Sequence, residues 1–124
     1  MKRTMLKSKI HRCVVTGADV HYEGSIAIDS ELMAKADILP YEKLDIWNVD
    51  AGTRFSTYAI VGKPGSGEIT VNGAAARLVA AGDKVIIASW LDLEPDEIAA
   101  HKPKLLFVDE HNRVKSSAPK LAIS

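Results

Sequence analysis

The chain has 124 residues, of which 47% are hydrophobic and 26% are charged, a composition typical of one globular domain and not of a disordered segment. Its 16 basic and 16 acidic residues cancel to a formal net charge of zero, which argues against a nucleic-acid-binding protein that depends on phosphate contacts. Cys13 is the only cysteine, so an internal disulfide is excluded.

The opening residues 1–12 contain no apolar run of signal-peptide length, and no segment approaches the length of a membrane span. We therefore expect a cytoplasmic protein with no membrane partner and no nucleic-acid partner. A single domain over residues 1–124 buries a real but small core, so association into an oligomer would help to stabilise it.

The first part of the chain predicts strands around one helix. Residues 3–15 mix apolar and basic side chains, which predicts one extended strand or two short ones, and a turn signal follows at residues 16–19. Residues 25–28 are short and apolar enough for a strand. Asp29 or Ser30 can then cap a helix over residues 31–36, before Pro40 marks the exit from it.

The second part of the chain alternates between short strands and turns that contain glycine or proline. Polar and apolar side chains alternate in residues 44–49 and 54–61, and residues 63–67 predict a hairpin loop. The remaining expected elements are strands over 68–71, 84–90 and 105–108, a helical turn over 73–76, a short helix over 94–100 and an irregular tail from Asn112. This pattern indicates a mainly β fold that closes, or nearly closes, into a barrel.

Most of the motifs that identify a functional site are missing from the sequence. The four histidines lie far apart and Cys13 stands alone, so no Cys/His cluster has metal-ligand spacing and no metal is expected. The phosphate-binding G-x-x-x-x-G-K-[ST], the dinucleotide-binding G-x-G-x-x-G and the hydrolase G-x-S-x-G patterns do not occur. An ordinary serine hydrolase or nucleotide-binding fold therefore has no support.

The pair Gly24-Ser25 is by itself most often a plain turn, but it also permits a rearrangement of the backbone. The serine hydroxyl can attack the preceding carbonyl and turn the amide into an ester. Glycine before the serine eases the attack because it has no Cβ and tolerates unusual dihedrals, and a donor must hold the developing oxyanion. β-Elimination and hydrolysis then give a pyruvoyl group and ammonia. Its carbonyl forms a Schiff base with a substrate amine and draws electrons from the carbanion that decarboxylation leaves.

Six stretches carry a family resemblance: MLKSKIHR at 5–12, HYEGS at 21–25, DIWNV at 45–49, RFSTYAI at 54–60, VNGAAA at 71–76 and GDKVIIA at 82–88. In this order and spacing, over roughly residues 1–90, the sequence resembles the bacterial pyruvoyl-dependent aspartate 1-decarboxylases. Each stretch alone is weak, whereas six in register are specific. Beyond Trp90 the sequence contains no motif of the family, and only its length and general composition are similar.

The resemblance implies a six-stranded double-psi β-barrel with short helices, assembled as a homotetramer with active sites between neighbouring subunits. It implies self-cleavage into a β chain of residues 1–24 and an α chain of residues 25–124, which begins with the pyruvoyl cofactor derived from Ser25. The implied reaction forms a Schiff base with L-aspartate, releases CO2 and yields β-alanine for pantothenate and coenzyme A biosynthesis. Whether a maturation factor assists the cleavage is left open.

The same resemblance implies the catalytic roles. Ser25 is the pyruvoyl precursor, and Tyr58 donates a proton to the carbanion after decarboxylation. Thr57 takes part both in self-cleavage and in substrate contact, and Asn72 steadies the carbonyl of the Gly24-Ser25 bond. If residues 54–61 form a strand, Thr57 and Tyr58 point to opposite faces, so they serve one site only through a local twist, or they serve different steps or subunits.

Substrate binding is assigned in the same way. Lys9 and Arg54 are the cations for the two carboxylates of aspartate, and the guanidinium of arginine suits a bidentate contact. The backbone of Gly73, Ala74 and Ala75 contacts the substrate, because the small side chains of this segment let its backbone come close to a ligand.

Plain structural interpretations stand beside these roles. Without the resemblance, Lys9 and Arg54 would be solvated surface charges, and Tyr58 would be packing. Trp47 is interpreted as packing close to the site. His11 and Tyr22 are expected near the site, without acting as primary catalysts.

Two alternatives from the sequence remain. The first is a non-catalytic β-barrel that acts as a binding or oligomerisation module and keeps its Gly24-Ser25 bond. Barrel packing alone, however, asks for none of Lys9, Arg54, Tyr58 and Asn72. The second is a pyruvoyl enzyme that acts on glutamate or another amino acid, which initial rates with aspartate and glutamate would distinguish.

Overall fold

The computed structural model describes residues 1–115, in which eight strands form one continuous sheet. The strands are β1 (Arg3–Val14), β2 (Gly17–Asp19), β3 (Ser25–Asp29), β4 (Lys43–Asn48), β5 (Arg54–Gly62), β6 (Ile69–Asn72), β7 (Lys84–Leu93) and β8 (Lys104–Phe107). Three short helices accompany them: α1 (Ser30–Ala36), the 3-10 helix η1 (Gly73–Leu78) and α2 (Pro95–Ile98). The strand order is β2-β6-β3-β5-β4-β7-β1-β8.

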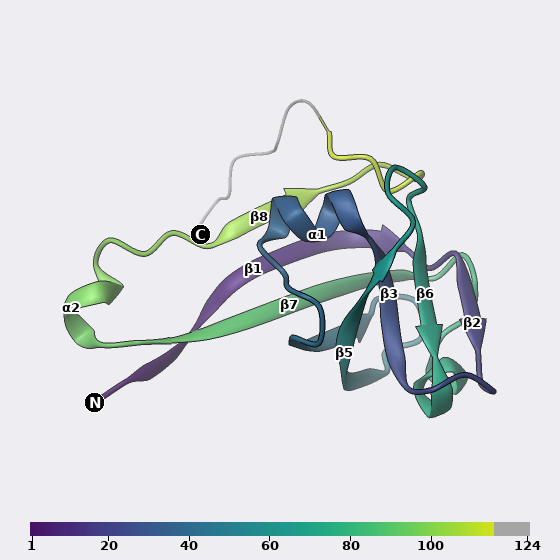
Figure 1. Ribbon diagram of the computed structural model, residues 1–124, viewed down its shortest axis with the longest axis horizontal. Helices are drawn as coiled ribbons and strands as arrows, with labels where there is room; N and C mark the ends of the chain where they lie inside the picture. Colours follow the sequence, from purple (N-terminus) through teal and green to yellow (C-terminus); the bar gives the residue numbers. More distant parts are fainter. Residues whose placement is uncertain (116–124) are drawn as a thin grey trace.

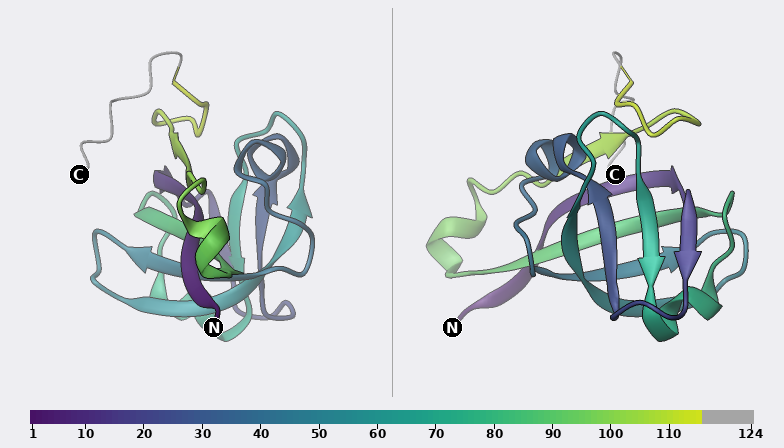
Figure 2. Two further views of the ribbon diagram at one scale, coloured as in Figure 1. Left: turned by 90° about the vertical axis from the view of Figure 1, so that its left-hand side faces the viewer. Right: turned by 45° about the vertical axis from the view of Figure 1, so that its right-hand side comes forward.

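The sheet closes into a barrel because β1 continues almost directly into β2. β1 pairs with β7, whereas β2 pairs with β6 at the other end of the strand order. Between them, Thr16 N donates to the carbonyl of Ile69 at 2.8 Å. Counted as one bent strand, β1 and β2 complete a six-stranded barrel with β3 to β7, and β8 adds a parallel strand beside β1 (Figure 2).

The predicted fold class is confirmed. The parallel pairs β3–β5 and β2–β6 interlock with antiparallel pairs, as expected for a double-psi barrel, and the helices are few and short. Two local predictions are wrong. Residues 17–19, expected within a turn, form β2 because they pair in register with residues 70–72 of β6. Residues 63–67, expected as a hairpin loop, join β5 to β6 without a hairpin, because β3 lies between these two strands and pairs with both. The predicted tail from Asn112 contains an isolated bridge between Val108 and Val114. The rest of that tail, residues 116–124, lies outside the described residues.

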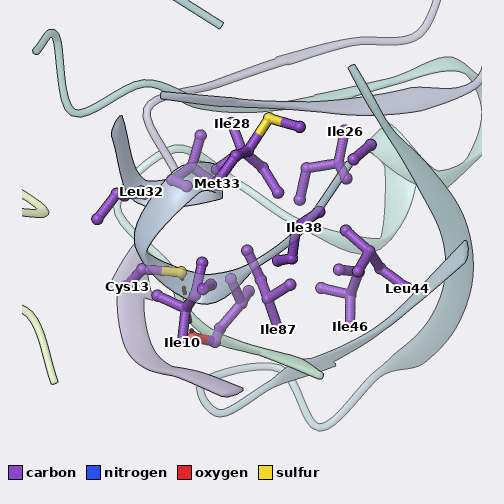
Figure 3. Close-up of a cluster of buried hydrophobic side chains, with 14 of the residues drawn as sticks. Ile10, Cys13, Ile26, Ile28, Leu32, Met33, Ile38, Leu44, Ile46 and Ile87 are labelled. Carbon is purple, nitrogen blue, oxygen red and sulfur yellow. Dashed lines mark hydrogen bonds between the residues drawn. The ribbon is translucent and has the colours of Figure 1, made fainter. Parts of the chain in front are cut away.

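Apolar side chains from the strands fill the barrel interior (Figure 3). Burial in β4 alternates strictly, with Leu44 and Ile46 inside, which matches the predicted two-residue period. Ile10, Ile26 and Ile87 reach the same cluster from β1, β3 and β7, and each is fully buried. Each such side chain contributes about 1.5–3 kcal/mol by leaving water.

Asp29 ends β3, caps α1 and also fixes the loop between β5 and β6. Its carboxylate accepts from the backbone N–H of Glu31 at 2.8 Å, which confirms the predicted helix cap. It also accepts from Gly65 and Gly67 at 3.0 and 2.8 Å. Burial alone would raise the pKa of Asp29, but these backbone donors outweigh it and lower that pKa.

The longest strands, β1 and β7, run together beyond the barrel and carry the N-terminus and α2 at their far end (Figure 1). Asn112 anchors the chain after β8 by donating to the carbonyls of Val14 and Gly67 at 2.8 and 2.7 Å. Among residues 1–115, no helix is both long and apolar enough to cross a membrane.

Candidate active site

Ser25 and Asn72 face each other across the antiparallel pair of β3 and β6. Both are buried, with Ser25 2% exposed and Asn72 6% exposed. The Asn72 side-chain amide donates to Ser25 Oγ at 3.1 Å, and Ser25 Oγ donates to the carbonyl of Glu23 at 3.3 Å. The amide therefore contacts the serine hydroxyl, whereas the sequence assigned it to the carbonyl of the Gly24-Ser25 bond.

The backbone of Gly73 passes close to that of Gly24. Its φ is +81°, a left-handed conformation that suits glycine. A Cβ added to Gly73 would lie 2.6 Å from the Cα of Gly24 and 2.8 Å from its nitrogen. A Cβ added to Gly24 would meet nothing within 4 Å, so the steric need for glycine lies at Gly73. We call Gly24, Ser25, Asn72 and Gly73 the cleavage cluster.

The two other residues of the small-residue segment follow Gly73 in η1. Ala74 is exposed and Ala75 is half-buried against the hydrophobic core. Of the three residues expected to present their backbone to the substrate, Gly73 alone is buried beside Gly24.

Thr57 and Tyr58 lie in the middle of β5, next to the point where β3 begins with Ser25. β3 and β5 are parallel, and their shared ladder begins where Ile26 pairs with Ala59, so Ser25 and Tyr58 are the residues just before it. Burial alternates along this part of β5, with Tyr58 exposed and Thr57 half-buried. The two side chains therefore point to opposite faces of the strand, as predicted. The Tyr58 ring packs beside Tyr41 at a centroid distance of 6.2 Å.

The two candidate cations lie on the outer sheet face, whereas Ser25, Asn72 and Gly73 of the cleavage cluster are buried. Lys9 of β1 pairs with Ala88 of β7, which in turn pairs with Asp45 of β4. Arg54 opens β5 and pairs with Trp47, two residues beyond Asp45 on β4. Residues directly opposite one another, and every second residue along a strand, share a face, so Lys9 and Arg54 belong to one face. We call Lys9, Trp47 and Arg54 the cationic face.

Arg54 is exposed and its Cζ lies 5.4 Å from the centroid of the Trp47 ring. Together with Ile86 and the turn after β4, these two side chains line a hollow of about 190 Å³. Trp47 is half-buried and packs beside Trp90, so the expected packing role near the site agrees with its surroundings.

His11 and Tyr22, the two residues expected near the site, lie in different places. His11 is half-buried on β1 with its ring edge against Phe107, and its Nδ1 is buried with no hydrogen-bond partner among residues 1–115. Burial lowers the pKa of His11, and the charges of Lys9, Arg12 and Lys115 lower it further. Tyr22 is 57% exposed in the loop that leads to Ser25.

Sequence reasoning gave no role to Asp45 and Trp90. The Trp90 Nε1 donates to Asp45 Oδ2 at 2.9 Å, and Ser56 Oγ donates to Asp45 Oδ1 at 2.5 Å. The alternation of residues 44–49 could have placed Asp45 on the face of Trp47, but its contact with β7 depends on sheet register. In the described part of the chain, no three His, Cys, Asp or Glu side chains are grouped to hold a metal ion.

Comparison with known proteins agrees with the resemblance in the sequence. The family model described as aspartate decarboxylase matches residues 1–115. The aspartate 1-decarboxylase of Syntrophotalea carbinolica is 71% identical over 112 residues, which cover 90% of this chain and 86% of that protein. The protein of the same name from Legionella pneumophila (strain Lens) is 58% identical, with 94% and 88% covered. That of Syntrophobacter fumaroxidans is 54% identical over the full length of both chains.

Among solved structures, the rationally designed protein mkDPBB_sym_86 has a TM-score of 0.46 and 14% identity, with 64% of this chain and 91% of that chain covered. A likeness of this size adds nothing to the assignment. The sequence relatives do, because they share more than half of their aligned residues with this chain along nine-tenths of its length or more. Since the family model also spans every described residue, the chain belongs to the aspartate decarboxylase family.

Proposed function

We propose that this chain decarboxylates L-aspartate to β-alanine with a pyruvoyl group that it makes from its own Ser25. The activity is that of the named relatives, whose sequences match along nearly the whole chain. The observation that carries the proposal is the convergence of Asn72 and Gly73 on the Gly24-Ser25 bond. A non-catalytic barrel has no need of a buried amide donor against a buried serine hydroxyl at this one bond.

Self-cleavage begins when Ser25 Oγ attacks the carbonyl carbon of Gly24. The C–N bond breaks, the serine nitrogen takes up the hydroxyl proton and an ester joins the two residues. Loss of the Ser25 Cα proton then expels the Gly24 carboxylate and leaves dehydroalanine. Water adds to this residue and ammonia leaves, which gives a pyruvoyl group at the start of residues 25–124. No oxidant or reductant is consumed.

The cleavage cluster favours this sequence of steps. The Asn72 amide holds the hydroxyl at 3.1 Å, on the strand that pairs directly with Ser25. Gly73 lets the chain pass close to Gly24, where any larger residue would displace the bond. Thr57 lies within β5, two residues before the Ala59 that pairs with Ile26, and we assign it a donor role toward the oxyanion that the attack creates.

The same residues fit a small carbonyl group at position 25. Ser25 is 2% exposed, its oxygen has an amide donor in Asn72, and Gly73 contributes no side chain to crowd it. When present, the pyruvoyl group supplies an electrophilic carbonyl that takes up the substrate amine and accepts the electron pair released by the departing CO2. Tyr58, which is partly exposed one residue before the Ala59 that pairs with Ile26, then delivers a proton to the substrate carbon.

Binding of the substrate carboxylates falls to Lys9 and Arg54, and these residues lie on the outer sheet face. We infer that the site is completed where one subunit brings its cationic face to the cleavage cluster of another, within a homotetramer. Backbone groups of Gly73, Ala74 and Ala75 would contact the substrate from the cluster side. In this assembly the enzyme acts in the cytoplasm and supplies β-alanine for pantothenate and coenzyme A biosynthesis.

Initial rates with aspartate and glutamate test the proposed activity, with CO2 release and the amine product measured on fully cleaved protein. A difference of one methylene is worth about 10- to 200-fold in kcat/KM, and we expect aspartate to be preferred by a factor in this range. The Ser25→Ala protein serves as the matched control and should release no CO2. A preference for glutamate would contradict the substrate assignment, and no CO2 release from either amino acid would contradict the activity.

A further inference from the structure

The exposed side chain of Arg54 lies over an aromatic ring. Its Cζ lies 5.4 Å from the centroid of the Trp47 ring, within the range of a cation–π contact. Among residues 1–115, no carboxylate lies within ion-pair distance of Arg54. A guanidinium that stacks through its face keeps the N–H groups on its edge for a carboxylate. The stack therefore orients Arg54 and leaves its donors available.

The ring below Arg54 is itself held by a second indole. Trp90 of β7 lies beside Trp47 with 6.3 Å between ring centroids and 57° between the ring planes. Both rings are half-buried, and their strands are direct neighbours in the sheet. A tilted aromatic pair of this kind limits how far either ring can rotate.

Asp45 fixes the orientation of the second indole. One carboxylate oxygen accepts from Trp90 Nε1 at 2.9 Å, and the other accepts from Ser56 Oγ at 2.5 Å. With both oxygens engaged, the half-buried carboxylate links β7 to β5, the strand that carries Arg54. A hydrogen bond to an ionised acceptor is stronger than one between neutral groups.

We propose that Asp45 and Trp90 are positioning residues that hold Trp47 beneath Arg54, so that the guanidinium meets a carboxylate of the substrate. The inference rests on the proposed function, because it takes Arg54 as a carboxylate-binding residue. If Trp90 only covered the sheet, a phenylalanine would serve equally well. Tryptophan differs from phenylalanine here by the indole N–H that donates to the half-buried Asp45 carboxylate, and the effect of losing this hydrogen bond can be measured.

Steady-state kinetics on fully cleaved protein test this role. Trp90→Phe keeps an aromatic ring but removes the N–H donor, and Asp45→Asn removes the ionised acceptor. We expect each to raise KM for aspartate about 3- to 10-fold with kcat within about twofold, because a cation–π contact and its support affect binding in this range. Asp92→Asn is the matched control: it removes from β7, the strand of Trp90, a carboxylate that accepts from Thr4, and KM should stay unchanged.

The Asp45→Asn result distinguishes positioning from simple charge effects. Removing a negative charge near Arg54 would by electrostatics alone tighten the binding of an anion and lower KM. Loss of positioning raises KM. An unchanged or lower KM in Asp45→Asn, or an unchanged KM in Trp90→Phe, would overturn the proposal. If either variant fails to fold, Ser56→Ala serves in its place, because it removes one hydrogen bond to Asp45. The KM of Ser56→Ala should rise by a smaller factor, and an unchanged KM would overturn the proposal.

Succinate, a dicarboxylate without an amine, gives a readout that needs no turnover. The chain contains two tryptophans, and both belong to this aromatic pair, so indole fluorescence reports on it alone. We expect succinate to quench or shift the emission of the cleaved protein, with a dissociation constant about 3- to 10-fold weaker in Asp45→Asn than in Asp92→Asn. Equal dissociation constants for succinate in the two variants would overturn the proposal, whether or not aspartate is the substrate. If the protein had no decarboxylase activity but the succinate constants differed as expected, only the proposed function would be contradicted.

Discussion

The cleavage cluster and the cationic face differ in how completely one chain assembles them. In the cluster, the buried residues Ser25, Asn72 and Gly73 converge on the bond between Ser25 and the exposed Gly24. On the cationic face, Arg54 is exposed on Trp47, and Lys9 lies two strands away from Trp47 across β7. Under the proposed function, the difference means that one chain carries the groups for its own cleavage but not a closed pocket for a substrate. Substitutions in the two regions should therefore change different measurements.

The largest effect is expected from Ser25→Ala, which removes the attacking hydroxyl. The variant should fold and remain one chain, because alanine fits a buried strand position and nothing else in the cluster can form the ester. Denaturing electrophoresis after prolonged warm incubation measures the uncleaved fraction. Appearance of the two normal chains would contradict the assignment of Ser25.

The next effect is expected from Tyr58→Phe, which removes the proposed proton donor while keeping the ring beside Tyr41. Cleavage should proceed, but kcat should fall by about 10²- to 10⁴-fold, the usual contribution of a positioned acid. Rates of β-alanine formation on fully cleaved protein decide this. Unchanged kcat would rule out Tyr58 as the donor.

Asn72→Ala should affect self-cleavage instead of decarboxylation. Loss of the amide that contacts Ser25 Oγ is expected to slow self-cleavage by about 10²- to 10³-fold, as loss of a positioned donor does elsewhere. The time course of chain cleavage in purified precursor measures this rate. If cleavage were as fast as in the unaltered chain, the contact in the structure would have no part in the reaction.

Arg54→Gln is expected to act on substrate binding alone. The charge-assisted contact with a carboxylate is worth about 10- to 100-fold in KM, and the rate of self-cleavage should not change. Comparing KM for aspartate with the cleavage time course of the same variant tests both statements. A slower cleavage would show that the two regions are not separable in the way the structure implies.

The smallest functional effect is expected from Asp29→Asn, at the end of β3 opposite to Ser25. Its carboxylate accepts from three backbone N–H groups, so the variant should lose about 1–3 kcal/mol of stability with normal cleavage and KM. The lowered pKa of Asp29 means that this stabilisation is present above about pH 4 and is lost as the pH falls further. Urea unfolding of both proteins at neutral and acidic pH should therefore show a difference that narrows in acid.

Much of the fold follows from local sequence pattern. The alternation in residues 44–49 matched the burial of β4, and the Asp29 cap matched the start of α1. β2 was missed because three residues, Gly17–Asp19, carry no strand pattern of their own and become a strand only through pairing with β6.

The candidate site divides in the same way between local and long-range information. Gly24-Ser25 can be found from the chemistry of two adjacent residues. The steric role of Gly73 depends on a contact with the backbone of Gly24, which lies 49 positions earlier in the chain. The contact between Asp45 and Trp90 likewise depends on the register of β4 against β7, which no local pattern encodes.

The intact mass of the purified protein under denaturing conditions tests the central claim most directly. We predict two species, one ending at Gly24 and one beginning at residue 25, with the second lighter by one ammonia than a chain that begins with serine. A precursor caught early would convert to these species on warm incubation. A folded protein that keeps the single mass of the whole chain after that incubation would contradict the account.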